Sequence, residues 1–138
     1  MKVIGLDGKE YSWNFTKHNE ARADCSMLHS RVRILLRAIF PYDCIYEEVA
    51  LPGIKTEIVK RVLMADFYIH APRLMIEVQG EQHDKFVEFF HHNRSEFFRA
   101  RKLDSLKRQW CHQNEITLVE LAHDGTDAQW EQQIRNIK

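Results

Sequence analysis

The chain has 138 residues and a mass of 16.5 kDa, and 44% of its residues are apolar and 29% charged. This size and composition predict one globular domain, residues 1–138, with a single modest core. No stretch approaches the roughly 20 consecutive apolar residues of a membrane span, and the start of the chain becomes polar too soon for a signal peptide. We therefore expect a cytoplasmic protein with no membrane partner. Its three widely spaced cysteines predict reduced thiols rather than disulfides.

The charges balance overall, with 20 Lys and Arg residues against 20 Asp and Glu residues, which excludes a uniformly basic nucleic-acid binder. They are nevertheless sorted along the chain. Residues 17–37 carry five basic and two acidic groups, and residues 85–110 carry seven basic and three acidic groups. Between them, residues 38–84 carry eight acidic and four basic groups. This pattern suits a polyanion partner that contacts two basic segments, although solvated helix faces would give the same charges.

The first elements are predicted from turn and capping residues. Residues 1–16 form a predicted hairpin whose Asp7-Gly8 dipeptide suits a type I′ turn. Ser26 is a good N-cap for a helix whose apolar residues recur at helical spacing until Pro41 ends it. Residues 45–51 then alternate as a strand.

The second half of the chain alternates strands and helices. Residues 62–69 and 74–79 are two strands that a short connection should pair antiparallel. A long helix follows over about 93–111, then a strand over 116–121 and a C-terminal helix over 126–138 that begins with a capping box. This order predicts an α/β or α+β domain with a mixed central sheet.

Two carboxylates interrupt otherwise apolar strands. Asp66 stands within the first strand of the predicted pair and Glu77 within the second, eleven residues later. Burying such a charge is unfavourable unless a cation or hydrogen-bond donors meet it. If the strands pair through their short turn, the two carboxylates converge and form an oxygen-rich site suited to Mg²⁺ or Mn²⁺. Each carboxylate taken alone would be read as a surface residue of a half-exposed strand.

Ala65-Asp66, ten intervening residues and Glu77-Val78-Gln79 resemble the core motif of the PD-(D/E)XK nuclease superfamily. The segments Ile76 to His83 and Asp104 to Lys107 are similar to its very-short-patch-repair-like branch, also called EDxHD. The resemblance covers about residues 26–121. It implies a restriction-endonuclease-like αβββαβ core and a Mg²⁺- or Mn²⁺-dependent endodeoxyribonuclease, a hydrolase of phosphodiester bonds in a bacterial or phage-infected cell.

The resemblance also implies roles for individual residues. Asp66 is expected to be the central metal ligand, and Glu77 a second ligand or a group that orients water. His83 is expected to act as a general base or transition-state stabiliser, since histidine exchanges a proton near neutral pH. Asp104 would join the same catalytic cluster. A helical i, i+4 ion pair with Arg108 is the alternative for Asp104.

The sequence departs from the family pattern at two positions. Gln79 stands where a lysine is usual, so this catalytic position lacks its positive charge. His29 stands at the acidic position of the first helix. Both departures bear on the number of metal ions and on the roles of the catalytic residues.

The contacts with DNA are expected on the segment that follows Gly80. Aromatic side chains there could wedge between base pairs, as in mismatch-repair relatives, or close the core. Basic side chains of the second long helix could line the DNA backbone, and a histidine near its start could reach a phosphate. These candidate nucleic-acid-binding residues are Phe86, Phe89, Phe90, His92, Arg94, Arg101, Lys102 and Arg108.

Several alternatives remain beside this hypothesis. Cys25 with His29, and Cys111 with His112, could contribute to a structural Zn²⁺ site, but no CxxC pair supports one and ordinary buried thiols are favoured. A branched-DNA resolvase, an RNA-cleaving enzyme, or a non-cleaving module that binds DNA or protein would fit the same fold. We expect a monomer that nicks DNA, or a homodimer that cuts both strands.

Overall fold

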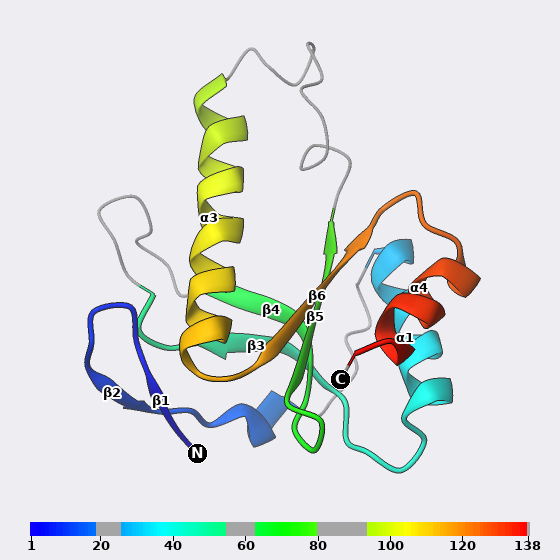
Figure 1. Cartoon of the computed structure of the whole chain (residues 1–138), viewed down its shortest axis with the longest axis horizontal. Helices are drawn as coiled ribbons and strands as arrows, with labels where there is room; N and C mark the ends of the chain where they lie inside the picture. The colour runs from blue at the N-terminus through cyan, green and yellow to red at the C-terminus, as the bar shows by residue number, and fades with distance from the viewer. Residues whose placement is uncertain (19–25, 55–62, 80–93, 138) are drawn as a thin grey trace.

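A four-stranded sheet with helices on both of its faces dominates the computed structural model, which describes residues 1–18, 26–54, 63–79 and 94–137 (Figure 1). The predicted order of elements is confirmed, and the chain is an α+β protein with an αβββαβ core. The elements are β1 (Lys2–Ile4), β2 (Glu10–Ser12), the 3₁₀ helix η1 (Phe15–His18), α1 (Met27–Ile39), β3 (Tyr46–Leu51), β4 (Leu63–Ile69), β5 (Leu74–Gln79), α3 (Arg94–Gln113), β6 (Thr117–Ala122) and α4 (Asp127–Arg135).

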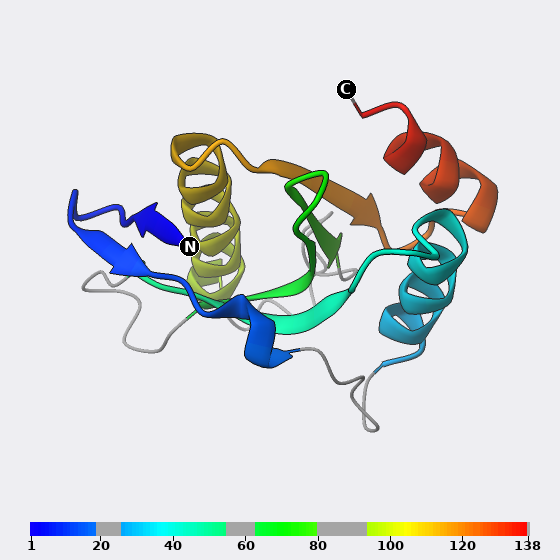
Figure 2. The ribbon, with the colours of Figure 1, turned by 90° about the horizontal axis from the view of Figure 1, so that it is seen from below.

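The sheet is mixed, with the strand order β3-β4-β5-β6. The first three strands run antiparallel to their neighbours, as predicted for β4 and β5, while β6 pairs parallel with β5 after the crossover through α3. Seen from below, α3 and the N-terminal hairpin lie on one side of the sheet, and α1 and α4 lie on the other (Figure 2). Each face of the sheet therefore has its own helical cover.

Capping residues set the starts of two helices where the sequence predicts them. The Ser26 side chain accepts a hydrogen bond from the His29 backbone N–H, which satisfies a free donor of the first turn of α1. Thr126 and Gln129 form a reciprocal capping box at the start of α4. The last helix is shorter than predicted, because it ends at Arg135 and the half-buried Ile137 packs against the core beyond it.

Two hydrophobic cores lie on opposite faces of the sheet. The core under α3 joins the hairpin residue Trp13 to Tyr68 of β4 and Trp110 of α3, whose rings are in mutual contact around Trp13. The core under α1 and α4 contains Phe67 of β4 and Trp130 of α4. These opposed cores fix the sheet between the helices, so the strands can present polar residues at defined positions.

The hairpin turn differs from the predicted two-residue type I′ turn. Gly5 N–H donates to the Lys9 carbonyl oxygen, so five residues form the connection, and Gly8 has a positive φ of 81° while Asp7 is not among the positive-φ residues. The reason is tertiary packing. A Cβ on Gly5 would meet the Cα of Gly53 at 2.7 Å, which shows how closely this loop docks on the connection after β3.

Candidate metal site

Four acidic residues lie at one level of the four-stranded sheet. The register of β3 and β4 places Glu48 opposite Asp66, between paired positions on either side. The last pair of the β4–β5 ladder is Phe67 with Ile76. Continued by one position, the same register places Asp66 opposite Glu77. Glu77 is aligned in turn with Glu120 of β6. We call Glu48, Asp66, Glu77 and Glu120 the carboxylate row.

The strands are irregular at the level of the row. Residues two apart in a regular strand share a face, yet Ala65 belongs to the core under α3 and Phe67 to the core under α1. The alternation of β4 thus breaks at Asp66. Its neighbour Glu48 has a φ of 51°, an uncommon left-handed conformation for a residue other than glycine. Backbone strain of this kind is concentrated at functional sites, and here it occurs at Glu48, directly opposite Asp66.

Beyond the last backbone pair of β4 and β5, the Asp66 side chain connects the two strands. Its Oδ2 atom accepts a hydrogen bond from the backbone N–H of Val78 at 2.8 Å. The Asp66 side chain therefore joins the two strands where their backbones separate. The sequence predicts that Asp66 and Glu77 converge if their strands pair, and the structure brings them together.

Glu77 is buried and paired with a lysine from α3. Lys107 Nζ lies 2.9 Å from Glu77 Oε1, and the two side chains are only 15% and 12% exposed. Burial and the adjacent Asp66 carboxylate raise the pKa of Glu77 to about 8, although Lys107 acts in the opposite direction. Burial would lower the pKa of Lys107, but the charge and hydrogen bond of Glu77, together with the charges of Asp66 and Asp104, outweigh burial and raise that pKa. Glu77 can therefore bind or release a proton near neutral pH.

Lys107 is a site residue that sequence reasoning missed, as are Glu48 and Glu120 of the carboxylate row. A signal was present, since Lys107 interrupts the apolar stripe of α3 that runs through Leu103, Leu106 and Trp110. After burial and the Glu77 contact, the charges of Asp66 and then Asp104 also raise the pKa of Lys107. The part of Asp104 in the catalytic cluster stays a prediction.

Gln79, at the position where a lysine is usual in the family motif, contacts the β6 end of the carboxylate row. Its side-chain amide donates to Glu120, the last member of the carboxylate row. Arg108 contacts the same carboxylate through Nε and through Nη2, the latter at 2.8 Å. Arg108 thus forms an ion pair with Glu120 of β6, whereas the alternative considered from the sequence was a pair with Asp104 on its own helix. The cation beside Glu77 comes from Lys107.

At the other end of the row, His29 of α1 lies beside Glu48 and Asp66. One potential ligand atom from each of the three residues lies within 4.8 Å of the others. His29 is buried, and its ring stacks on Phe67 with centroids 4.2 Å apart. Its Nε2 atom donates to Oε1 of Glu47 at 2.7 Å. Two carboxylates and an imidazole are a suitable donor set for a divalent cation, so these residues fit a metal ion.

Glu47 is held by a second partner from α1. Arg33 contacts both of its carboxylate oxygens, each at 2.7 Å, in a two-bond arrangement. Burial would raise the pKa of Glu47, but the hydrogen bonds from Arg33 and His29 outweigh burial and lower it. Glu47 is therefore ionised and fixed in position.

The predicted DNA-contacting residues fall partly outside the described part of the chain. Lys102 and Arg101 are exposed on α3. Arg108 is about half exposed, and its guanidinium is engaged by Glu120. The remaining predicted site residues lie outside the described residues, or outside the described side chains in the case of Arg94; they are His83, Phe86, Phe89, Phe90, His92 and Arg94.

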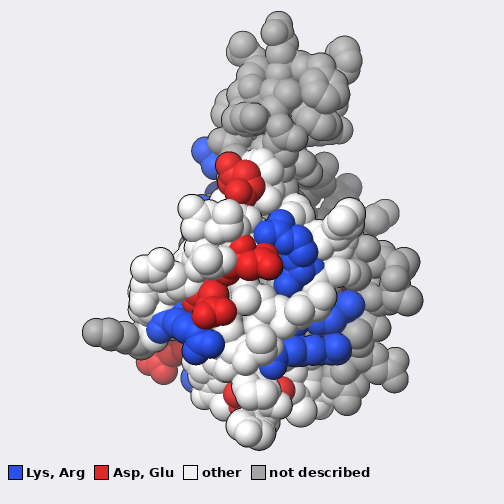
Figure 3. All heavy atoms as spheres, turned by 90° about the vertical axis from the view of Figure 1, so that its right-hand side faces the viewer, with Lys and Arg blue, Asp and Glu red and all other residues white. Residues whose placement is uncertain are grey.

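The basic residues of α1 are partly neutralised within the fold. Arg33 is committed to the buried Glu47, and Arg31 binds Asp127 of α4 at 2.9 Å while its guanidinium lies 4.2 Å from the Trp130 ring centroid. The face that carries α1 and α4 shows acidic and basic side chains interspersed rather than one basic surface (Figure 3). In the described residues, α3 is the better candidate for contact with a polyanion.

The cysteine of α3 is a core residue. Cys111 is buried, its Sγ lies 3.4 Å from the sulfur of Met75, and burial raises its pKa to about 12. Zinc binds the thiolate, whereas Cys111 is packed in the core under α3 as a neutral thiol, as expected for an ordinary buried cysteine. His112, its neighbour in the zinc hypothesis, is exposed, and Cys25 lies outside the described residues.

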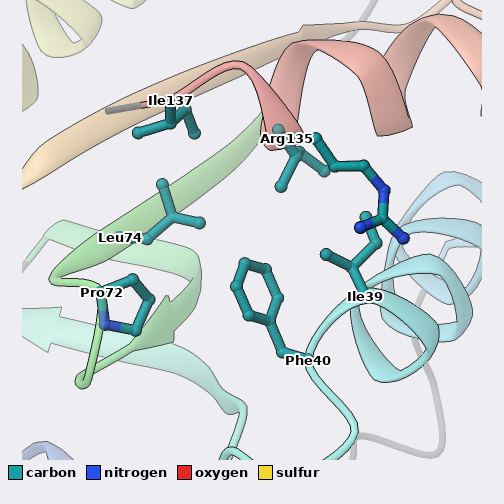
Figure 4. Close-up of a pocket in the computed structure, with 7 residues that line it drawn as sticks. Ile39, Phe40, Pro72, Leu74, Arg135 and Ile137 are labelled. Atoms are coloured by element: carbon teal, nitrogen blue, oxygen red, sulfur yellow. The ribbon is translucent and has the colours of Figure 1, made fainter.

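A surface pocket of about 310 Å³ lies away from the carboxylate row, at the other end of β5 (Figure 4). Ile39, Phe40 and Leu74 point into it from α1 and β5, and Arg135 borders it. Its lining contains no member of the row and no carboxylate. This pocket has apolar walls and does not contribute to the candidate metal site.

No protein-family model matches the chain, and no solved structure matches it. The chain is similar to Uncharacterized protein 307L of Invertebrate iridescent virus 6, with 37% identity over 65 residues, 47% of this chain and 33% of the viral protein. Uncharacterized protein 033L of Invertebrate iridescent virus 3 is 38% identical over 50 residues, 36% of this chain and 26% of the viral protein. The matched segments thus span a third or less of these relatives. Separately, none of the described helices has the length and apolar character needed to cross a membrane.

Proposed function

We propose that the protein is a metal-dependent DNA endonuclease that hydrolyses phosphodiester bonds, and a member of the PD-(D/E)XK superfamily. The observation that carries the proposal is the meeting of Asp66 and Glu77 beside Lys107 where two strands separate. The hydrogen bond from the Val78 N–H gives Asp66 a structural role, but it does not account for a buried carboxylate and lysine placed beside it. Like charges side by side in a sheet are destabilising, so their presence here favours a functional role.

The residues divide into two groups by their partners. Asp66, Glu48 and His29 have donor atoms close enough together to hold a divalent cation, which would polarise a phosphate ester and acidify a water molecule. Glu77 is better suited to orient water and accept its proton, because Lys107 already occupies one of its oxygens. Lys107 places a positive charge beside the reacting groups, where negative charge develops on a phosphate.

The charge on α3 supports a nucleic acid as the substrate class. A polyanion binds exposed basic side chains, and Arg101 and Lys102 are exposed on the helix that also carries Lys107. The similarity to two proteins of invertebrate iridescent viruses supports a viral origin and action inside an infected cell. His83 remains a proposed general base, which a His83→Ala variant would test through a rate loss of about 10²- to 10⁴-fold.

The decisive experiment incubates supercoiled plasmid with the purified protein and Mg²⁺, Mn²⁺ or EDTA. Cleavage should require the metal and should be lost in Asp66→Asn, which keeps the side-chain shape but removes the charge. Asp43→Asn is the matched control, because Asp43 lies in the turn before β3 and outside the row. Metal-dependent cleavage at the same rate in all three proteins would overturn the proposed site. DNA binding without cleavage would support the non-cleaving module, and cleavage confined to RNA or branched DNA would support those alternative substrates.

A further inference from the structure

His29 is an unusual member of a site otherwise built from carboxylates. Its side chain is only 7% exposed, and its ring is fixed on one face by stacking on Phe67. One ring nitrogen of His29 lies within 4.8 Å of a carboxylate oxygen of Glu48 and one of Asp66. Nε2 is hydrogen-bonded to Glu47, so Nδ1 is the nitrogen left to coordinate a cation. The fold thus orients an imidazole toward the candidate site rather than merely burying it.

The support behind His29 resembles that of a metal ligand. Metal-binding histidines commonly donate their other ring N–H to a carboxylate, which fixes the tautomer and strengthens the ligand. Glu47 provides this carboxylate, and Arg33 holds both of its oxygens from one turn further along α1. Glu47 is adjacent in sequence to Glu48, so β3 supplies both the candidate ligand Glu48 and the carboxylate that orients His29.

We propose that His29 makes the cation site selective for a first-row transition metal ion, with Mn²⁺ as its probe, over Mg²⁺. The inference deepens the proposed function by naming the class of metal, and it rests on that proposal only through the shared carboxylates. Mg²⁺ prefers oxygen ligands in a near-ideal octahedron and gives up its water reluctantly. Transition-metal ions accept imidazole together with carboxylates, so a nitrogen ligand shifts the preference toward them.

The test measures metal binding without DNA. Mn²⁺ is titrated into the metal-free protein while the free ion is counted by electron paramagnetic resonance, and Mg²⁺ is then added to compete. Wild type should prefer Mn²⁺, and His29→Gln should reduce the ratio of the two affinities by about 10-fold or more, the scale seen for groups that tune a metal site. His112→Gln, at an exposed histidine of α3, is the control and should retain the wild-type ratio.

A second measurement uses the wild-type protein, so that the inference can be tested even if His29→Gln does not fold. Electron spin echo modulation of Mn²⁺ bound to wild type should reveal coupling to ¹⁴N, because an imidazole nitrogen is a ligand, and His112→Gln should retain this coupling. No nitrogen coupling in wild type would overturn the inference. An unchanged affinity ratio in a folded His29→Gln protein would also overturn it.

The two proposals can fail separately. Nitrogen-coupled Mn²⁺ and an affinity ratio that depends on His29, together with an intact plasmid, would uphold the metal selectivity and overturn the nuclease proposal. Plasmid cleavage with an affinity ratio independent of His29 would uphold the nuclease and overturn the selectivity.

Discussion

The carboxylate of Asp66 bonds the backbone N–H of Val78 across the point where β4 and β5 stop forming a ladder. One side chain thereby has two tasks, since it joins the strands and contributes a charge to the candidate metal site. The two tasks can be separated chemically. An amide oxygen can still accept the Val78 hydrogen bond, but an amide lacks the negative charge that holds a cation.

Asp66→Asn and Asp66→Ala should therefore differ in stability while both lose metal binding. Asn should unfold with nearly the wild-type free energy, whereas Ala leaves the partly buried Val78 N–H without its partner and should lose about 1–3 kcal/mol. Urea denaturation in EDTA measures this difference. Equal stability of the two variants would show that the bond to Val78 does not support the sheet.

Glu77 should make the metal-free protein less stable as the pH rises. Its pKa is raised from 4.5 to about 8 by burial and by Asp66, so the folded state binds the proton more tightly than the unfolded chain. This stabilisation is complete below pH 4.5 and is lost as the pH rises toward about 8. Its slope is at most about 1.4 kcal/mol per pH unit.

Denaturation in EDTA across this range should show a flatter pH dependence for Glu77→Gln than for wild type. Glu131→Gln serves as the control, because the Glu131 side chain is 45% exposed and bonded to Arg135 within α4. Parallel curves for wild type and Glu77→Gln would contradict the raised pKa.

Lys107→Met should affect both the titration and the proposed reaction. The methionine keeps most of the buried side chain but removes the ammonium beside Glu77, so the pH window of the preceding prediction should move upward. Plasmid cleavage should fall by about 10²- to 10³-fold, the range for losing one group that stabilises developing charge. Lys9→Met, on the exposed hairpin turn, should change neither quantity. An unchanged titration in Lys107→Met would remove Lys107 from the cluster.

Two arginine pairs allow a direct comparison of buried and exposed ion pairs. Arg33→Met leaves the 2%-exposed Glu47 side chain without its two-bond partner and should reduce the free energy of unfolding by about 3–5 kcal/mol. Arg135→Met removes an exposed pair on α4 and should change it by no more than about 0.5 kcal/mol. Thermal or urea unfolding gives both values. Similar small losses would mean that Arg33 does not hold Glu47 in solution.

Salt dependence tests the proposed DNA-facing side of α3. Replacing Arg101 and Lys102 by Ala should weaken DNA binding for all sequences and reduce the slope of log K against log salt by about one unit per lost phosphate contact. The double variant Lys2→Ala, Lys9→Ala, on the hairpin, removes the same charge and should leave the slope unchanged. An unaltered slope in the α3 variant would exclude this surface as the DNA contact.

Local signals explain what the sequence could predict. Ser26 and Thr126 begin their helices because each side chain caps donors only three residues away. Asp66 and Glu77 converge because a short antiparallel connection leaves few registers for their strands. Both inferences involve residues close enough in sequence for geometry to be fixed without knowledge of the rest of the fold.

The remaining site residues depend on distant packing. Glu48 joins the row through the register of β3 with β4 and through its own positive φ. No glycine or asparagine beside Glu48 in the sequence signals this backbone conformation. Lys107 and Arg108 reach Glu77 and Glu120 of the sheet only because α3 packs across it. The i, i+4 spacing on α3 could suggest only a partner on the same helix, Asp104. Side-chain direction from a helix to a sheet is set by tertiary structure.

Asn114, the residue that follows α3, has a consequence for association between chains. Its side-chain oxygen accepts the Ile4 N–H at 2.7 Å, and its amide donates to the Ile4 carbonyl oxygen at 3.0 Å. Gln113 donates to the same carbonyl and to that of Gly5. These amides imitate a neighbouring strand and occupy the backbone N–H and carbonyl groups of Ile4, at the end of β1. The hairpin is thus closed to strand addition at Ile4, which protects a short exposed ribbon from pairing with other copies of the protein.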